Sequence, residues 1–110
     1  IVTSSIASLI NESIVGTSYM PAKAAVNHFV RHMAMELGAY GIRVNAVRPG
    51  FIYTEMHASG GEPNRVDRVK AFVPMKRGGL ADEVAQAIVW LLSEKASFTT
   101  GGFIDVTGGK

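Results

Sequence analysis

Two side chains that could exchange a proton with a substrate stand four residues apart, Tyr19 and Lys23. Residues at this spacing share one face of an α-helix, so the pair would place an ammonium beside a phenol. A nearby cation favours the phenolate, which suits a tyrosine to general acid–base catalysis near neutral pH. Upstream, Ser5 follows a short apolar run, and its hydroxyl could hydrogen-bond a substrate oxygen whose charge changes during reaction. The three residues together predict proton transfer at a substrate oxygen.

These side chains meet only if the elements around them form a parallel sheet. Residues 1–5 are typical of a short strand, and Ser18, a favoured N-cap residue, predicts the start of a helix that runs to about Gly38. Residues 42–47 predict a second strand, which Pro49-Gly50 ends. Strand, helix and strand with short joints form a βαβ unit with a right-handed crossover. Its polar residues then gather at the carboxyl ends of the strands, where open α/β sheets bind ligands.

The central helix is predicted to be amphipathic. Its apolar face carries Ala22, Val26, Phe29, Val30, Met33, Ala34 and Leu37 at a period near that of an α-helix. Its opposite face carries Asn27, His28, Arg31, His32 and Glu36. The two sets therefore lie on different faces of the predicted helix.

The second half of the chain predicts one more helix and one more strand. Residues 55–77 lack a clean period and are expected to form a long loop with at most a short helix, as functional lids often do. A helix is predicted from Asp82 to Ser93, and a strand over 103–106. Three strands and two main helices over residues 1–110 make half of a doubly wound α/β sheet, with one strand edge left open.

The composition excludes several functional classes. Of the 110 residues 47% are hydrophobic and 18% charged, which is typical of a globular domain rather than a disordered chain. A net charge of +2 with scattered basic residues gives no nucleic-acid footprint, and no apolar run is long enough to span a bilayer. The absence of cysteine excludes disulfides and thiolate metal sites. Because the chain starts with Ile1 inside an apolar run, we expect it to have been cut from a longer protein.

Four segments resemble, in order, those of the short-chain dehydrogenase/reductase family. They are Ile1-Val2-Thr3-Ser4-Ser5, Tyr19-Met20-Pro21-Ala22-Lys23, Ile42 to Gly50 (Ile-Arg-Val-Asn-Ala-Val-Arg-Pro-Gly) and Thr99 to Gly109. In that family they are the active-site strand, the catalytic helix, the cofactor-closing strand and the terminal strand. The resemblance covers nearly the whole chain. It implies the C-terminal half of a Rossmann-like sheet, and hydride transfer between NAD or NADP and a carbonyl or alcohol substrate.

The resemblance also assigns roles to residues. Tyr19 would be the proton donor or acceptor, Lys23 would hold the nicotinamide ribose and favour the phenolate, and Ser5 would orient the substrate carbonyl. The residues implied in cofactor binding are Tyr19, Lys23, Pro49, Gly50, Ile52 and Thr54. The residues implied in substrate binding are Ser5, Met56 and His57. No metal is implied, and the choice between NAD and NADP stays open because it depends on residues near the adenosine ribose.

Two features depart from the family pattern. Ser5 lies one position further from Tyr19 than the family usually places its serine, where Ile6 stands. We interpret this as one extra residue in a loop over 6–17, with Ser4 as the alternative serine. The family's glycine-rich nucleotide-binding turn and its structural asparagine are absent from the chain. They would lie upstream of Ile1.

Other residue types that could bind ligands have simpler explanations. His28 and His32 are one helical turn apart, but no third metal ligand accompanies them, so we expect a solvated or interface helix face. His57 falls in the expected substrate loop, where a surface position is the simpler alternative to substrate contact. Met56 is expected to line the substrate cavity, and Trp90 to pack in the core.

Two hypotheses about the function of the chain follow. In the first, the chain is the catalytic half of an NAD(P)-dependent oxidoreductase of the cytoplasm, acting on a small alcohol or ketone, and its whole protein forms a homo-oligomer, a tetramer or a dimer. In the second, the chain is a truncated product that acts only as an assembly or interaction piece. We expect the isolated chain to be inactive in either case. No nucleic-acid or membrane partner is expected.

Overall fold

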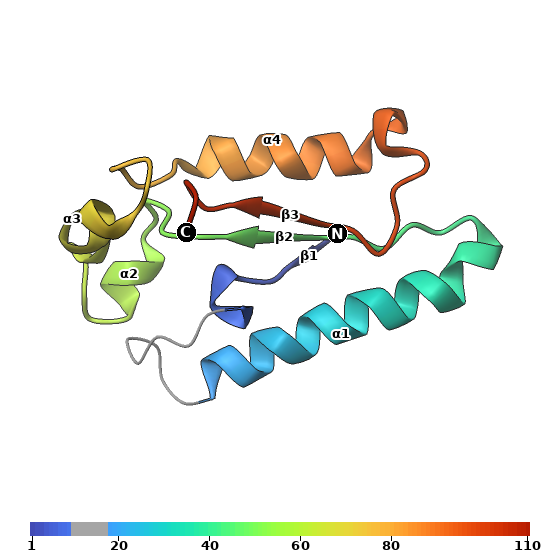
Figure 1. Ribbon diagram of the computed structural model, residues 1–110, viewed down its shortest axis with the longest axis horizontal. Helices are drawn as coiled ribbons and strands as arrows, with labels where there is room; N and C mark the ends of the chain where they lie inside the picture. The colour runs from blue at the N-terminus through green and yellow to red at the C-terminus, as the bar shows by residue number, and fades with distance from the viewer. Residues whose placement is uncertain (10–17) are drawn as a thin grey trace.

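The computed structural model describes residues 1–9 and 18–110 and shows a three-stranded parallel sheet (Figure 1). The strands are β1 (Val2–Thr3), β2 (Ala46–Pro49) and β3 (Phe103–Val106), in the order β1-β2-β3. Ala46 is the register partner of both Val2 and Phe103. The predicted α/β class and the predicted third strand are confirmed. The expected loop over 6–17, with its additional residue, lies largely outside the described residues.

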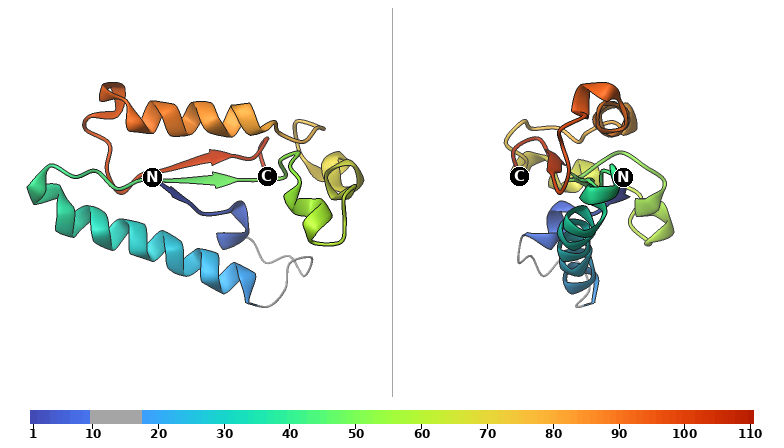
Figure 2. Two further views of the ribbon diagram at one scale, coloured as in Figure 1. Left: turned by 180° about the vertical axis from the view of Figure 1, so that it is seen from behind. Right: turned by 90° about the vertical axis from the view of Figure 1, so that its right-hand side faces the viewer.

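Two long helices cover the sheet. α1 (Tyr19–Leu37) and α4 (Ala81–Leu92) lie on opposite faces, as the end-on view in Figure 2 shows. Because the strand order is β1-β2-β3, the connection from β1 to β2 and the connection from β2 to β3 cross the sheet in the same direction. Helices on opposite faces therefore give the two crossovers opposite hands, so one of them departs from the usual right-handed rule.

The ends of α1 follow from particular residues. Ser18 occupies the N-cap position but makes no side-chain cap hydrogen bond. Pro21 lies in the first turn, where its missing N–H costs no helical hydrogen bond. The helix tightens into the 3₁₀ turn η2 (Gly38–Tyr40) and stops at Gly41, whose φ of 72° is left-handed and suits glycine.

The second strand lies further along the chain than the sequence predicts. Strand pairing was expected over 42–47, whereas β2 spans Ala46–Pro49. Asn45, the residue just before β2, has a fully buried side chain. Its Nδ2 donates to the Thr99 carbonyl at 2.8 Å and its Oδ1 accepts from the Gly102 N–H at 2.9 Å. The amide thus ties the chain before β2 to the turn before β3, beside the backbone bonds from the Val2 N–H to the Asn45 carbonyl and from the Gly101 N–H to the Val44 carbonyl.

The helix α4 starts one residue earlier than predicted, at Ala81. Its N-cap is Leu80 rather than Asp82, because the carboxylate of Glu83 reaches back to accept the Leu80 N–H at 2.8 Å. Arg77 also donates two hydrogen bonds to this carboxylate. Chiefly through Arg77, and then through the Leu80 N–H, the pKa of Glu83 falls to about 2.

The segment expected to be one long loop is more structured than predicted. It contains α2 (Met56–Ser59), α3 (Arg65–Val69) and the 3₁₀ turn η3 (Lys70–Phe72). A parallel bridge between Ile52 and Gly79 closes its base. Each helix is too short to show a hydrophobic period in the sequence. The segment of residues 55–77, which we call the excursion, packs compactly at one end of the sheet (Figure 1).

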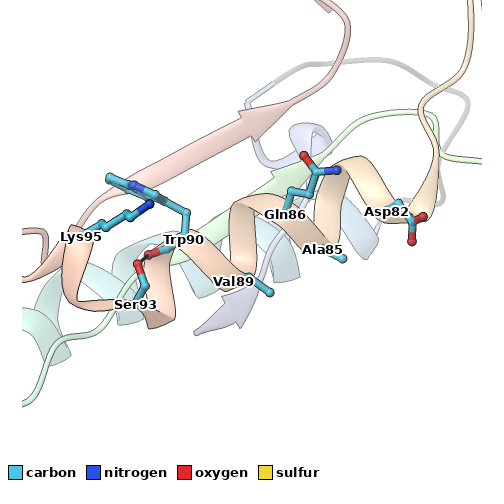
Figure 3. A pocket seen from close by; sticks show the side chains of 7 residues that line it. All are labelled: Asp82, Ala85, Gln86, Val89, Trp90, Ser93 and Lys95. Atoms are coloured by element: carbon cyan, nitrogen blue, oxygen red, sulfur yellow. Dashed lines mark hydrogen bonds between the residues drawn. The ribbon is translucent and has the colours of Figure 1, made fainter.

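The core contains small and branched residues from every layer. Its most buried members include Val30, Val47, Val66, Val73 and Leu91. The expectation that Trp90 packs in the core is wrong, since Trp90 is 41% exposed, and Phe29 on the apolar face of α1 is 54% exposed. Trp90 instead lines a shallow groove on the outer face of α4, with Lys95 at the same end and Asp82 at the other (Figure 3). Among the described residues no helix combines the length and the apolar character that a membrane span requires.

Candidate active site

One cavity lies at the carboxyl ends of the strands, where α1 and α4 begin and α2 packs (Figure 1). Its volume is about 340 Å³. All the residues that the sequence predicted for catalysis, cofactor binding and substrate binding line it. They are Ser5, Tyr19, Lys23, Pro49, Gly50, Ile52, Thr54, Met56 and His57. Residues up to 52 positions apart in the chain thus meet at one rim, as the parallel topology predicts.

The end of β1 brings two buried hydroxyls to this cavity, and they have different partners. Ser5 is the N-cap of the 3₁₀ turn η1 (Ile6–Ser8), and its Oγ accepts the Ala7 N–H at 3.2 Å. The hydroxyl of Ser4 is directed to α1, where it lies 2.8 Å from Asn27 Oδ1. Within residues 1–9 and 18–110 no acceptor takes the Ser5 proton, whereas the Ser4 proton is directed to the helix.

The first two turns of α1 supply the phenol and the ammonium. Tyr19 is 37% exposed, and the Nζ of Lys23 lies 5.8 Å from its ring centroid. The same Nζ donates to the Thr3 carbonyl at 3.1 Å, so the last residue of β1 holds the lysine beside the cavity. The four-residue spacing thus produces the predicted neighbourhood of cation and phenol.

The segment after β2 forms the opposite wall. The Gly50 N–H donates to the Val106 carbonyl at 3.0 Å, and a Cβ on Gly50 would lie 3.0 Å from the Thr107 Cα. Glycine therefore lets the two chain segments approach each other closely. Ile52 is buried, whereas Thr54 stays exposed at the mouth of the cavity.

The two predicted substrate residues come from α2. His57 is half-buried, and its Nε2 lies 2.9 Å from the Ile52 carbonyl oxygen, which fixes the ring on the backbone beside the cavity. Met56 is 71% exposed. Both line the cavity from the side of the excursion that begins after Thr54.

One wall of the cavity was not predicted as part of the site. The start of α4 contributes four apolar side chains, Ala81, Val84, Ala85 and Ile88. Their spacing of three, four and seven residues marks one helix face. The helix start points at the rim because β2 and β3 are parallel, so this period together with the topology could have identified the wall.

A second tyrosine near the cavity has a different environment. The Tyr53 hydroxyl donates to Asp67 Oδ1 at 2.8 Å, and this hydrogen bond raises the pKa of Tyr53. The pKa of Asp67 is lowered by the same bond and then by the neighbouring Lys70 ammonium. Tyr53 is thereby tied to the excursion, and it does not line the cavity.

The histidines of α1 lie outside the cavity. His28 and His32 are exposed, and His32 Nε2 lies 3.1 Å from a Glu36 carboxylate oxygen. Within residues 1–9 and 18–110, no three histidine, aspartate or glutamate side chains are grouped closely enough to hold a metal ion.

Known proteins resemble the chain along its whole length. A family model described as enoyl-(acyl carrier protein) reductase matches residues 1–110. The uncharacterized oxidoreductase YgfF of Escherichia coli K12 is 61% identical over 107 residues, which cover 97% of this chain and 43% of that protein. The acetoacetyl-CoA reductase of Cupriavidus necator is 38% identical over 93 residues, which cover 84% of this chain and 37% of that protein. The chain thus spans less than half the length of these relatives.

Solved structures agree with the sequence relatives. A 3-oxoacyl-[acyl-carrier protein] reductase from Brucella melitensis superposes with a TM-score of 0.87 at 43% identity, over 97% of this chain and 40% of that one. A structure of such a reductase from Brucella melitensis with bound NAD gives 0.84 at 42% identity, over 97% of this chain and 38% of that one. A short-chain type dehydrogenase/reductase from Mycobacterium ulcerans gives 0.85 at 40% identity, over 97% and 39%. Sequence, fold and relatives agree, and the chain belongs to the short-chain dehydrogenase/reductase family of oxidoreductases.

Proposed function

We propose that this chain is the catalytic part of a longer NAD(P)-dependent oxidoreductase, the full-length enzyme, which interconverts a carbonyl and an alcohol. The observation that carries the proposal is the meeting of Ser5, Tyr19 and Lys23 at one cavity on the rim of a parallel sheet. Named relatives such as acetoacetyl-CoA reductase and 7alpha-hydroxysteroid dehydrogenase support the same reaction class. Their substrates differ widely, so the proposal stops at a small alcohol or ketone.

Ser5 has the hydrogen-bonding pattern of a donor to substrate. Its Oγ already accepts the Ala7 N–H, and a hydroxyl has one proton to give. A substrate carbonyl oxygen in the cavity would receive this proton as a hydrogen bond, which strengthens as negative charge develops on that oxygen. Ser4 is the weaker candidate because its proton is directed to Asn27.

Tyr19 is the proposed general acid in reduction and general base in oxidation. Its phenol would give a proton to the alkoxide oxygen as the carbonyl is reduced and take it back in the reverse direction. The Lys23 ammonium stabilises the negative charge that Tyr19 carries once its proton has left. The Thr3 carbonyl holds that ammonium in place, so the charge stays near the ring in the absence of ligands.

The residues at the cavity fit the nicotinamide end of the cofactor. Lys23 and Tyr19 offer donors to ribose hydroxyls, and Thr54 with the Ile52 backbone offers partners to a carboxamide. When bound, the nicotinamide supplies or accepts the hydride at the substrate carbon. The described residues hold no glycine-rich turn that leads from a strand into a helix, so the pyrophosphate and adenosine would bind to sequence outside this chain.

The remaining walls define the side of the cavity where substrate would bind. The four apolar side chains of α4 would contact a hydrocarbon part of the substrate, and Met56 would close over it from α2. His57, held on the Ile52 carbonyl, would offer its remaining ring nitrogen to a polar substituent. We place the full-length enzyme in the cytoplasm as a homo-oligomer, a dimer or tetramer. Light scattering coupled to size exclusion tests the oligomeric state.

The test is a substitution that removes one proton and nothing else. In the full-length enzyme, Tyr19→Phe should lower kcat by about 10²-fold or more on any alcohol or ketone that the wild type turns over with NAD or NADP. Tyr40→Phe is the matched control, since Tyr40 is 79% exposed at the far end of α1 and should leave kcat unchanged. Near-normal turnover by Tyr19→Phe would contradict the assignment.

The isolated 110-residue chain tests the alternative, in which the chain is only an assembly piece. We expect no measurable binding of NADH or NADPH, because the proposed contacts reach the nicotinamide end alone. The edge of β1 that does not pair with β2 should also promote self-association. Titration by fluorescence or calorimetry, with light scattering on the same sample, measures both. Saturable micromolar binding by a monomer would show that the chain folds a complete cofactor site.

A further inference from the structure

A chain of hydrogen bonds runs from the end of β1 into α1 and back to Ser5. The Ser4 hydroxyl donates to Asn27 Oδ1 at 2.8 Å, and Asn27 Nδ2 donates to Ser8 Oγ at 2.7 Å. The Ser8 hydroxyl in turn donates to the Ser5 carbonyl oxygen at 2.6 Å. Every hydroxyl uses its one proton in the same direction, so each bond polarises the next.

Asn27 lies on α1 where its hydrogen bonds connect the residues of the proposed active site. It follows Tyr19 by eight residues and Lys23 by four, so all three lie on one helix face. The Ser4 Oγ that bonds Asn27 also lies 3.3 Å from the Lys23 carbonyl oxygen. Asn27 thus ties the strand end that carries Ser5 to the helix turns that carry the phenol and the ammonium.

Only a side chain that accepts one hydrogen bond and donates another can connect Ser4 to Ser8. The amide of Asn27 accepts from Ser4 and donates to Ser8, whereas an ionised carboxylate accepts only and an alkyl group does neither. At the far end, the Ser5 carbonyl accepts both the Ser8 hydroxyl and, at 3.0 Å, the Ser8 N–H. The Ser5 backbone is therefore held by two bonds, one of which depends on Asn27.

We propose that Asn27 is a positioning residue that holds the Ser5 hydroxyl in a fixed position relative to Tyr19 and Lys23. This inference rests on the proposed function. Asn27 does not line the cavity and therefore acts through Ser8 on the backbone of Ser5, without touching substrate. Its removal should affect the transition state, where the Ser5 hydrogen bond is strongest, more than the binding of substrate or cofactor.

The experiment compares variants of the full-length enzyme by steady-state kinetics, dinucleotide titration and thermal unfolding. Asn27→Ala should lower kcat by about tenfold, a loss typical of a misaligned group rather than a missing one, while KM and the cofactor Kd change by less than about twofold. Ser8→Ala removes the hydroxyl that links Asn27 to the Ser5 carbonyl and should lower kcat to the same extent. His28→Ala, on the neighbouring exposed residue, should behave as wild type in all three measurements.

A double substitution separates positioning from general damage. In a Ser5→Ala background there is no hydroxyl to position, so adding Asn27→Ala should lower kcat no further. An additive fall, an unchanged kcat in Asn27→Ala, or a fall in kcat matched by an equal rise in the cofactor Kd would each overturn the proposal. If Asn27→Ala does not fold, Asn27→Asp keeps the acceptor for Ser4 but cannot donate to Ser8. It should show the same fall in kcat, and wild-type turnover by this variant would also overturn it.

These outcomes are distinct from failure of the proposed function. If Ser5→Ala and Tyr19→Phe both retain wild-type turnover, the catalytic assignment itself is wrong, whatever Asn27 does. If both lose turnover while Asn27→Ala retains it, the proposed function stands and only the positioning role is wrong.

Discussion

Ser5 makes one structural hydrogen bond and is proposed to make a second one to substrate. Replacing Ser5 separates the two roles, because the first affects the free energy of unfolding and the second affects kcat. The side chain accepts the N–H of Ala7, which is 6% exposed, so Ser5→Ala leaves a buried N–H without its partner. That should lower the free energy of unfolding by about 1–3 kcal/mol. Loss of a hydrogen bond to a developing oxyanion should lower kcat by about 10²–10³-fold.

The stability loss cannot account for the expected activity loss. A domain with about 5–15 kcal/mol of stability that loses about 1–3 kcal/mol keeps more than about nine-tenths of its molecules folded at 25 °C. Unfolding would then change kcat by well under twofold. A much larger fall in kcat must therefore come from the hydroxyl itself.

Urea denaturation and steady-state kinetics on the same preparations measure the two effects. Ser5→Thr restores both the acceptor and the donor and should recover kcat to within about tenfold of wild type. Ser4→Ala removes the donor to Asn27 and should lower kcat by only about threefold, since it leaves the Ser8 bond to Ser5 intact. If Ser4→Ala proves the more damaging of the two, Ser4 is the substrate donor and the assignment of Ser5 is refuted.

Three further predictions concern the scaffold. Gly78→Ala would place a Cβ 2.3 Å from the Cγ1 of Val66, which is buried, so the excursion should shift and kcat/KM for substrate should fall while cofactor affinity holds, as kinetics and titration will measure. The pKa of Glu83 is lowered from 4.5 to about 2 by Arg77, so its stabilising contribution is present above pH 4.5 and lost as the pH falls toward 2; unfolding of Glu83→Gln should depend less steeply on pH in that window. Asn45→Val deprives two backbone groups of their buried partner and should lower the free energy of unfolding in urea by about 2–6 kcal/mol.

The sequence predicted which residues meet at the cavity better than it predicted the bounds of the elements between them. Order and spacing were sufficient for Tyr19 and Lys23, because a four-residue interval fixes their common helix face whatever the rest of the fold does. Strand β3 was predicted to the residue, because glycine pairs flank it on both sides. By contrast β2 was placed too early, because its bounds depend on the strands that pair with it, and these lie more than forty positions away on either side.

Periodicity also failed where an exposed face has a tertiary partner. Asn27 was placed on the polar face of an amphipathic helix, and its partners Ser4 and Ser8 were missed. The period shows that a side is polar, but not that the end of a strand reaches it. Trp90 was predicted to be core by residue type alone, yet its neighbour Leu91 takes the buried position and turns Trp90 outward. Both errors arise because a helical wheel orders residues around an axis without saying what lies on each side.

The cavity combines two kinds of wall that come from different parts of the chain. Many of its hydrogen-bonding groups come from β1 and the start of α1, where short contacts hold three of them: Lys23 on Thr3, Ser5 on Ala7, and Ser4 on α1. Its apolar wall comes from α4, and its outer edge comes from an excursion attached at the Ile52–Gly79 bridge. Substitutions in the excursion should therefore reshape the proposed space for substrate without disturbing the hydrogen bonds among Ser4, Asn27 and Ser8. This division of the walls fits a family whose relatives here carry the names of reductases and dehydrogenases for substrates as different as acetoacetyl-CoA and hydroxysteroids.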